Sequence, residues 1–392
     1  MTISARQTAA LSVDALRRLR SAKLFWISLA LSTLVALLCG YIGISEEGLS
    51  FPGFGTWENP VWNSTVLPPE EFYILVFTQF GISIWLAYAA NLLAVISTAS
   101  LVPALVDEGS VDLYLSRPMG RVRLFLTRYA TGLLFVALQA ACFSIAAMAV
   151  FGFRAGVFLP GLLWAVVYVT VFFSFLFCVS SLVGLLTGSG VTAILVTILF
   201  WMFIWAADWA EFSTLIFLEQ AESEVERRER EVSAAESIAR RFEENGSAVA
   251  RETAAGNLEN ARDNLEAAEA AVPTIKRVHD VMIAIKLPMP KTGETIGELQ
   301  KVLSNATELE RFEEQQEADA DRRLRERVGR RNFEDEEDAN RFLEAQRAQQ
   351  RGATDAVDRY YSRSFAWTFG TSFCFQGVLL AIACWVFGRR DL

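Results

Sequence analysis

The chain has 392 residues, of which 53% are hydrophobic and 21% charged, with a mean hydropathy of +0.30 and a formal net charge of −9. These values fit a uniform globule poorly, but they fit a chain in which charged and apolar residues are segregated. Residues 214–362 hold 33 of the 45 acidic and 23 of the 36 basic residues, so the rest is nearly neutral and apolar. The acidic balance of the chain therefore describes residues 214–362. A nucleic-acid partner would need a basic face, and we expect no such partner.

The residues that carry metal or catalytic chemistry are sparse. None of the five cysteines lies in 214–362, and no CxxC or Cys/His spacing suggests a metal site. The only histidine, His279, cannot form a zinc site or a Ser-His-Asp arrangement by itself. HExxH and GxSxG motifs are also absent. We therefore expect no metal, no catalytic residue and no enzyme activity in this chain.

Six apolar stretches are long enough to cross the roughly 30 Å hydrocarbon core of a bilayer. They are Leu24–Ile44, Phe72–Val102, Tyr129–Phe151, Phe158–Leu186, Val191–Ala210 and Phe365–Phe387. The first lacks an A-x-A-like cleavage site and is followed by further spans, so we expect it to be a membrane span rather than a cleaved signal peptide. The predicted fold is an all-α polytopic membrane protein with six transmembrane helices.

Positive charges gather on one side of these spans. They are Arg17, Arg18, Arg20 and Lys23 before the first span, Arg117, Arg121, Arg123 and Arg128 between the second and third, and Arg389 and Arg390 at the end. The positive-inside rule then predicts that both termini are cytoplasmic in a multi-pass protein of the cell (inner) membrane. An even number of spans agrees with that orientation. The loop 45–71, which contains Trp57 and Trp62, is expected on the outer side as an interfacial cap.

Polar residues within the spans have two interpretations. Gln79, Asn91, Gln139 and Gln376 either form interhelical hydrogen bonds, which we favour, or line a translocation path. Near the outer end of the fifth span, Asp208 and Glu211 either mark the boundary with water or line a cavity.

The most informative stretch is the loop at 103–128 between the second and third spans. Its central part reads Asp107-Glu108-Gly109-Ser110-Val111-Asp112-Leu113-Tyr114-Leu115-Ser116-Arg117-Pro118-Met119-Gly120-Arg121. Charges interleaved with leucines predict an amphipathic element along the membrane, followed by a turn at Pro118 and Gly120. A loop that only sets orientation needs no acidic residues, so that simpler interpretation is less favoured.

This loop resembles the first cytoplasmic loop of type-2 ABC exporter permeases, which typically reads D/E-x-G-T/S-x-D/E-x-L-L-S-x-P-x-x-R. The ending Phe387-Gly388-Arg389-Arg390-Asp391-Leu392 is similar to that family's F-x-R-R/K-D-hydrophobic tail. The chain looks most like permeases associated with multi-copper-enzyme maturation, although no residue assigns that cargo. The resemblance implies that the loop docks on a nucleotide-binding subunit. The implied docking residues are Asp107, Glu108, Gly109, Asp112, Leu115, Ser116, Arg117, Pro118 and Arg121.

The resemblance also implies the partners. The chain has no Walker A sequence, because Gly293–Gly297 (GETIG) lacks the glycine-lysine pair and the Ser/Thr that follow in that motif. No cofactor is therefore expected on this chain, and ATP and Mg would be bound by a separate ABC ATPase subunit. A transport path needs two membrane halves, so a second permease half is implied, in a homodimer or a heterodimer embedded in membrane lipid.

Residues 214–362 are predicted to form an extracytoplasmic helical hairpin between a membrane domain at 1–213 and a last span with a cytoplasmic tail at 363–392. Ile216–Val272 is rich in Ala, Glu and Arg and has a broken seven-residue repeat, which Pro273 ends or bends. A second helical stretch covers Gly297–Ser362. We expect these two stretches to pair as antiparallel, coiled-coil-like arms; a solvated spacer is the alternative.

Between these stretches, residues 278–300 are apolar and interrupted by proline. In the resembled family this place holds short re-entrant or interfacial helices, and Leu287-Pro288 and Met289-Pro290 fit it. The segment either returns to the membrane or forms the distal tip of the hairpin.

The sequence is consistent with two functions. The first is an ABC permease subunit that exports an unidentified substrate with ATP hydrolysed by its partner. The second is an ATPase-driven mechanotransmitting scaffold, which acts through the hairpin on an extracytoplasmic protein partner without translocation. An intramembrane enzyme is disfavoured, because no catalytic motif or pair of intramembrane acids is present.

Overall fold

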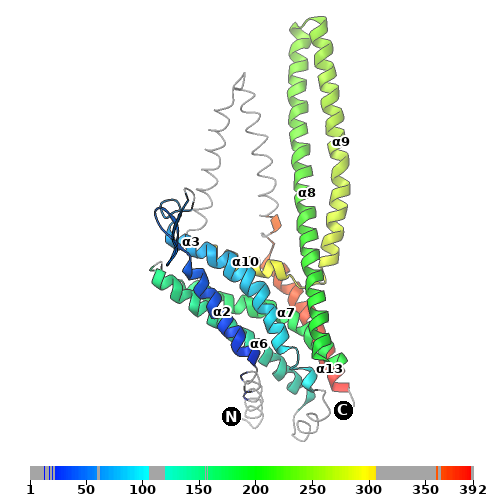
Figure 1. The fold of residues 1–392 in the computed structure, drawn as a ribbon. Helices are drawn as coiled ribbons and strands as arrows, with labels where there is room; N and C mark the ends of the chain where they lie inside the picture. The colour runs from blue at the N-terminus through cyan, green and yellow to red at the C-terminus, as the bar shows by residue number, and fades with distance from the viewer. Residues whose placement is uncertain are drawn as a thin grey trace. The chain divides into compact units, whose positions relative to one another are not determined.

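The computed structural model describes residues 13, 17, 20, 23–59, 62–105, 120–154, 156, 158–305, 359–360 and 363–389 (Figure 1). The described chain is mostly helical and divides into two compact units. The membrane unit comprises Met1–Ile204, Pro290–Glu314 and Phe365–Leu392, and the hairpin unit comprises Trp205–Met289 and Gln315–Ser364. Each unit is described below by itself.

Among the residues that the structure describes, six helical segments are long and apolar enough to cross a membrane. They are Lys23–Tyr41, Glu71–Leu105, Arg121–Arg154, Pro160–Thr187, Gly190–Glu244 and Ala366–Arg389. Each overlaps one of the six spans predicted from the sequence, so the chain has the six candidate spans of a multi-pass membrane protein.

The second and fourth spans and the last span each combine helices of different geometry. The elements of the spans are α2 (Lys23–Tyr41), α3 (Pro69–Val76), the π-helix η1 (Phe77–Ala90), α4 (Asn91–Thr98), the 3-10 helix η2 (Pro103–Leu105), α6 (Arg121–Arg154), the 3-10 helix η3 (Pro160–Leu163), α7 (Trp164–Thr187), α8 (Gly190–Asn245), the π-helix η4 (Ala366–Gly370) and α13 (Thr371–Arg389). Proline begins α3 and η3, where its missing N–H has no intrahelical partner to lose.

The core of the membrane unit lies between α2, η1, α6 and α7, where phenylalanine side chains fill the interior. Phe77, Phe135 and Phe173 are fully buried there. Gly132 lets α6 approach α7 closely, because a Cβ at this position would lie 2.4 Å from a ring carbon of Phe177. In the span that contains α7, 61% of the residues in its most apolar 18-residue stretch are buried. In the span that contains α13, the corresponding share is 17%. Thus α7 lies at the centre of the unit, whereas few residues of α13 are buried.

One correction to the all-α prediction is needed, because a small antiparallel sheet follows α2. Its strands are β1 (Gly43–Ile44), β2 (Gly48–Phe51) and β3 (Gly55–Glu58), in the order β1-β2-β3. Gly53 and Gly55 adopt φ values of +88° and +94° in the β2–β3 turn, which other residues adopt only with strain. The sheet lies within the loop 45–71 and at its edge, where the sequence predicts an ordered cap.

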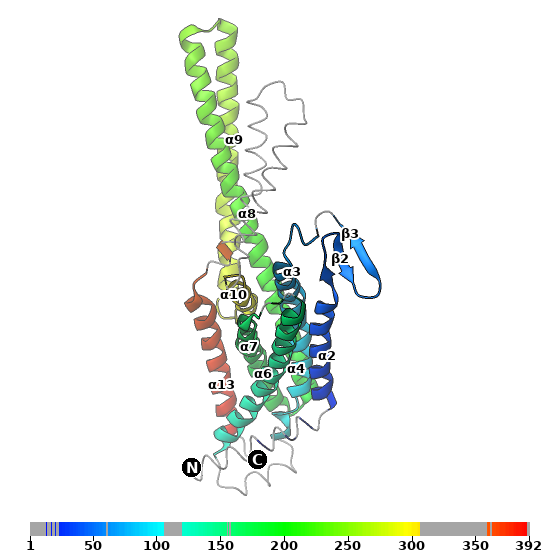
Figure 2. The same cartoon turned by 90° about the vertical axis from the view of Figure 1, so that its left-hand side faces the viewer.

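The hairpin unit is built from the second half of α8 and from α9 (Ala248–Lys286), which run side by side in antiparallel directions (Figures 1 and 2). The turn is at Gly246 and Ser247. The Ser247 hydroxyl caps α9 by accepting from the Ala250 N–H at 3.3 Å, and a Cβ on Gly246 would lie 2.5 Å from the Phe242 carbonyl oxygen. Arg262 and Glu236 link the two arms at 2.7 Å.

The predicted pairing of the arms was therefore wrong. We expected one helix over Ile216–Val272 to pair with Gly297–Ser362, but the first stretch itself folds back at Gly246. Pro273 lies inside α9 and does not end it. Most of the second stretch, 306–358, lies outside the described residues.

The segment 278–300 does not form the distal tip, because the turn between the arms is at 246–247. Its second half begins α10 (Thr292–Asn305), which belongs to the membrane unit and packs on α7 and η1. Leu299 is fully buried in the main core, and Gln300 donates to the Ser83 hydroxyl at 2.6 Å. Fourteen residues extend about 21 Å, too short to span a bilayer. The division of the chain therefore also differs from the predicted 214–362 insertion.

Candidate functional sites

The predicted coupling loop lies largely outside the described residues. Residues 106–119 contain Asp107, Glu108, Gly109, Asp112, Leu115, Ser116, Arg117 and Pro118, so the structure does not place these side chains. Arg121 is described, and it is the first residue of α6. In the C-terminal tail, Arg389 is the last described residue, and its guanidinium lies 4.7 Å from the ring centre of Trp385.

The two flanks of this loop are held by one buried cluster, which we call the loop-base cluster. Its members are Val102, Leu105, Leu124, Phe125, Leu185, Ala383 and Phe387. Val102 and Leu105 come before residues 106–119 of the loop, whereas Leu124 and Phe125 come after them. Phe125 and Phe387 lie 6.4 Å apart between ring centres, so the residue that begins the predicted C-terminal tail motif joins the same cluster. The structure thus brings together the flanks of the two sequence signatures that resemble the exporter family.

Close backbone packing supports the loop-base cluster. A Cβ on Gly184 of α7 would lie 2.9 Å from the Pro103 ring, so glycine permits η2 to pack directly on α7. Gly188 ends α7 in a left-handed conformation with φ of +67°, and its N–H donates to the Gly184 carbonyl at 2.9 Å. The GxxxG pattern at 184–188 therefore serves both packing and helix termination within this chain.

Two of the four polar residues proposed for a translocation path form contacts between helices. Gln376 of α13 donates to the Tyr129 hydroxyl at 3.0 Å and accepts from the Ser174 hydroxyl at 3.1 Å, which joins α13 to α6 and α7. Gln139 of α6 lies 3.4 Å from the Ser32 hydroxyl of α2. These contacts support the interhelical interpretation for both glutamines.

The other two polar residues have different surroundings. Asn91 is buried and donates to the Leu86 and Ala87 carbonyls of its own helical segment, where η1 passes into α4. The wider turns of a π-helix leave carbonyl groups available for such side-chain donors. Gln79 is exposed on η1.

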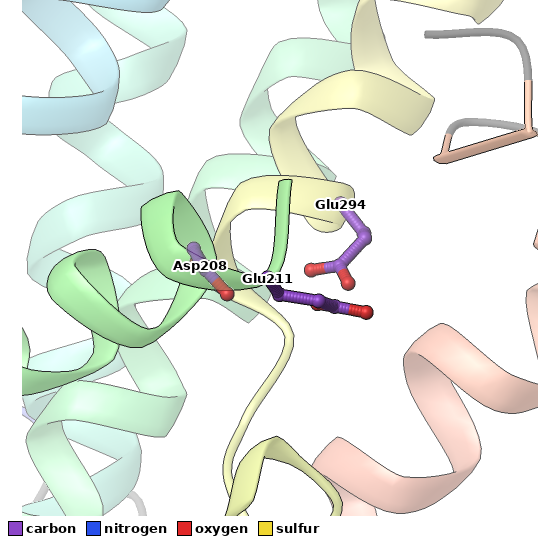
Figure 3. A group of neighbouring side chains, drawn as sticks. All are labelled: Asp208, Glu211 and Glu294. Carbon is purple, nitrogen blue, oxygen red and sulfur yellow. The ribbon is translucent and has the colours of Figure 1, made fainter. Parts of the chain in front are cut away.

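The second candidate site is a cluster of buried charges in the hairpin unit, which we call the ionic cluster. Lys286, at the end of α9, lies 2.8 Å from Asp208 and 2.6 Å from Glu211, and both acids extend from α8 (Figure 3). Arg363 pairs with the other oxygen of Glu211. The side chains of Lys286 and Glu211 are 2% and 0% exposed. Glu294, also drawn in Figure 3, is a buried residue of α10 in the membrane unit.

Aromatic and hydroxyl groups surround the ionic cluster. The Lys286 ammonium donates to the Tyr360 hydroxyl at 3.0 Å and lies 4.9 Å from the centre of its ring. The Arg363 guanidinium lies 5.2 Å from the same ring centre, so the two cations share one aromatic residue. Tyr360 also packs edge-on against Phe212 of α8.

A polar layer continues the cluster toward the arms. The Thr214 hydroxyl lies 3.1 Å from Nδ1 of His279, and Arg359 pairs with Glu219 at 2.6 Å. Burial lowers the pKa of His279, although the nearby Glu211 carboxylate partly opposes the shift. His279 is therefore mainly neutral at pH 7, as a buried hydrogen-bonding residue would be.

Within the described residues of the hairpin unit, the ionic cluster joins two acids, Asp208 and Glu211, to Lys286 and Arg363 from two other segments. Each buried carboxylate has a cation within hydrogen-bonding distance, and this offsets its loss of hydration. From the sequence, Asp208 and Glu211 either mark the boundary with water or line a cavity, and the structure adds that both pair with Lys286. Their partner Lys286 was missed, although a lone lysine in the apolar run VMIAIKLP was a signal.

No family model matches this chain, and neither a curated protein nor a solved structure matches it. The positive findings are thus the six candidate membrane spans, the loop-base cluster and the ionic cluster.

Proposed function

We propose that the chain is the membrane subunit of a type-2 ABC exporter. It works beside a second permease half, and a separate subunit hydrolyses ATP. Motion of that ATPase enters through the loop 103–128 and the C-terminal tail. The substrate is unidentified.

The convergence at the loop-base cluster is the observation that carries this proposal. A loop that receives force must be connected stiffly to the helices that move. Leu105 and Phe125 join the two flanks of the loop, and Phe387 adds α13 to the same packed cluster. Because packed interiors resist deformation, a displacement of this loop would be passed to α6, α7 and α13 as a rigid-body movement.

The ionic cluster favours mechanotransmission as the second candidate function. Lys286 and Arg363 both pair with Glu211 of α8. These pairs connect α8 with the end of α9 and with the segment before the last span. Because these segments are connected, movement of the adjoining spans would rotate the hairpin as a rigid body. Under this alternative, the hairpin would act on an extracytoplasmic protein without translocation of a substrate.

Affinity purification of the tagged chain from native membranes tests the ATPase partnership. We expect an ATPase with a Walker A sequence to co-purify, and charge reversal by Asp112→Lys or Arg117→Glu to reduce its recovery strongly. Glu47→Lys, at an exposed position of the small sheet, is the matched control and should leave recovery unchanged. Absence of an ATPase, or equal recovery with the loop variants, would refute the proposed function.

A shortened hairpin separates transport from transmission. Residues 225–272 are replaced by a short Gly/Ser linker, which keeps Asp208, Glu211 and Lys286. Two contacts between the arms, Glu236 with Arg262 and Thr214 with His279, define which residues lie opposite each other. In this register the two cut ends lie beside each other. Retained ATP-dependent export supports the permease. Loss of the cellular phenotype with ATPase stimulation intact supports the mechanotransmitting scaffold.

A further inference from the structure

We propose that the β2–β3 hairpin is a membrane-surface anchor that places Phe54 and Trp57 in the headgroup zone of a zwitterionic lipid leaflet. The inference concerns the small sheet after α2. It rests on the candidate spans and not on the partnership with an ATPase.

The strand register makes this hairpin amphipathic. Leu49 pairs with Trp57, and Ser50 pairs with Thr56. Cross-strand partners point to the same face, and successive residues alternate between faces. One face therefore carries Leu49, Phe51 and Trp57, whereas the other carries Ser50, Thr56 and Glu58.

The apolar face is directed toward the helices. Leu49 packs against the main core of the membrane unit, so the face that it shares with Trp57 points to the bundle side. Trp57 is nevertheless 65% exposed, because β3 extends past the helices, and Figure 2 shows the β2–β3 hairpin beyond the end of α2. Beside the end of a membrane-spanning helix lies the surface of the bilayer, and we place Trp57 against this surface.

Phe54 adds an exposed aromatic side chain at the tip of the hairpin. Its side chain is 89% exposed, between Gly53 and Gly55. The tip is tied to the end of the first span, because the Tyr41 hydroxyl donates to the Pro52 carbonyl at 2.5 Å. A β-hairpin with an exposed phenylalanine would be an aggregation hazard in water, whereas interfacial lipid accommodates aromatic rings.

Other exposed aromatic residues mark the same end of the membrane unit. Arg154, at the end of α6, donates to the carbonyls of Gly40 and Tyr41 at 3.0 and 3.3 Å, so α6 and α2 end beside each other. Phe153 is 91% exposed at that point, and Trp164 at the start of α7 is 53% exposed. Aromatic residues at the ends of spans form the belt that positions proteins at the lipid–water interface.

The charge of the hairpin selects the lipid class. Glu46, Glu47 and Glu58 are exposed on or beside the sheet. Arg154, the nearby cation, is held by backbone carbonyls. Acidic side chains are repelled by anionic headgroups within a Debye length, so the leaflet that receives this hairpin should be zwitterionic.

The test places an environment-sensitive fluorophore on Phe54→Cys in single-chain nanodiscs of phosphatidylcholine. The same label on Thr56→Cys, two residues away on the polar face, is the matched control. Both variants carry Cys374→Ala to remove the exposed native thiol, and the labelled C374A parent gives the background. Nitroxide near the lipid headgroup should quench most of the fluorescence at position 54 and little at position 56.

Equal quenching at both positions, or water-like emission at position 54, would overturn the proposal. An apolar emission at position 54 that lipid nitroxide does not quench would also overturn it, because protein rather than lipid would then cover the tip. In phosphatidylglycerol at low salt, quenching at position 54 should weaken, and added salt should restore it. Equal quenching in the two lipids would refute the zwitterionic preference. These outcomes do not depend on whether an ATPase binds the chain.

Discussion

Removal of the Lys286 ammonium should loosen the base of the hairpin unit strongly. This cation lies within 2.8 Å of both Asp208 and Glu211, and its side chain is 2% exposed. Loss of one partner from a buried ion pair costs about 3–5 kcal/mol. Arg363 still pairs with Glu211 in Lys286→Met, and Asp208 is 13% exposed, which allows partial hydration. We therefore expect about 3 kcal/mol, the lower end of that range.

Hydrogen exchange measured by mass spectrometry on the chain in nanodiscs provides the assay. A loss of about 3 kcal/mol in the free energy of local opening accelerates exchange roughly 100-fold, and the effect should appear in peptides that cover 275–286. Arg359→Gln is the surface control. Its guanidinium is 58% exposed, so water can replace it beside Glu219, whose side chain is 9% exposed, and exchange should rise far less than in Lys286→Met.

Restoring the charge balance distinguishes an electrostatic effect from a packing defect. Asp208→Asn, added to Lys286→Met, removes the charge of one carboxylate that pairs with Lys286 and retains the Glu211 and Arg363 pair. The double variant should recover much of the protection lost in Lys286→Met. Unchanged exchange in Lys286→Met, or no recovery in the double variant, would refute the stabilising role of the ionic cluster.

Three further predictions address orientation, packing and pH. Ser247→Cys at the turn of the hairpin should react with an impermeant maleimide outside intact cells, and protection there would contradict the proposed topology. Gly184→Leu should lower the thermal stability in detergent by about 1–3 kcal/mol, because its side chain meets Pro103, whereas Gly377→Leu on α13, where a Cβ meets nothing within 4 Å, should change it little. The folded pKa of His279 lies below its ordinary value of 6.5, so the unfolded state binds more protons as the pH falls. Protection of α9, corrected for intrinsic exchange rates, should therefore decrease below about pH 6.5 in the wild type and not in His279→Gln.

The membrane spans could be predicted because twenty consecutive apolar residues leave few alternatives, and each predicted span overlaps a long helix in the structure. The interhelical contacts of Gln139 and Gln376 also agreed with the favoured interpretation. Both predictions depend on the residue types within a short apolar stretch of the chain, which can be read directly from the sequence.

The arms of the hairpin could not be paired correctly, because the heptad pattern of Ile216–Val272 slips and gives no unique register. The turn at Gly246 and Ser247 was signalled only by a glycine followed by a helix-capping residue, and Pro273 was a stronger break signal that the structure overrides. The ionic cluster was equally hidden, since Glu211 and Arg363 are 152 residues apart. The register of β2 and β3 required coordinates, because short strands rich in glycine specify their pairing weakly.

An ATPase that acts on this chain through the loop 103–128 should hydrolyse ATP faster when the two are reconstituted together, so we would measure the hydrolysis rate of the reconstituted complex. The partner ATPase recovered from native membranes is measured alone, with the wild-type chain, and with the Asp112→Lys variant in the same nanodiscs. We predict that the wild-type chain stimulates hydrolysis and that the loop variant does not, although the variant keeps its helical content. A rate that is the same in all three samples would contradict the account.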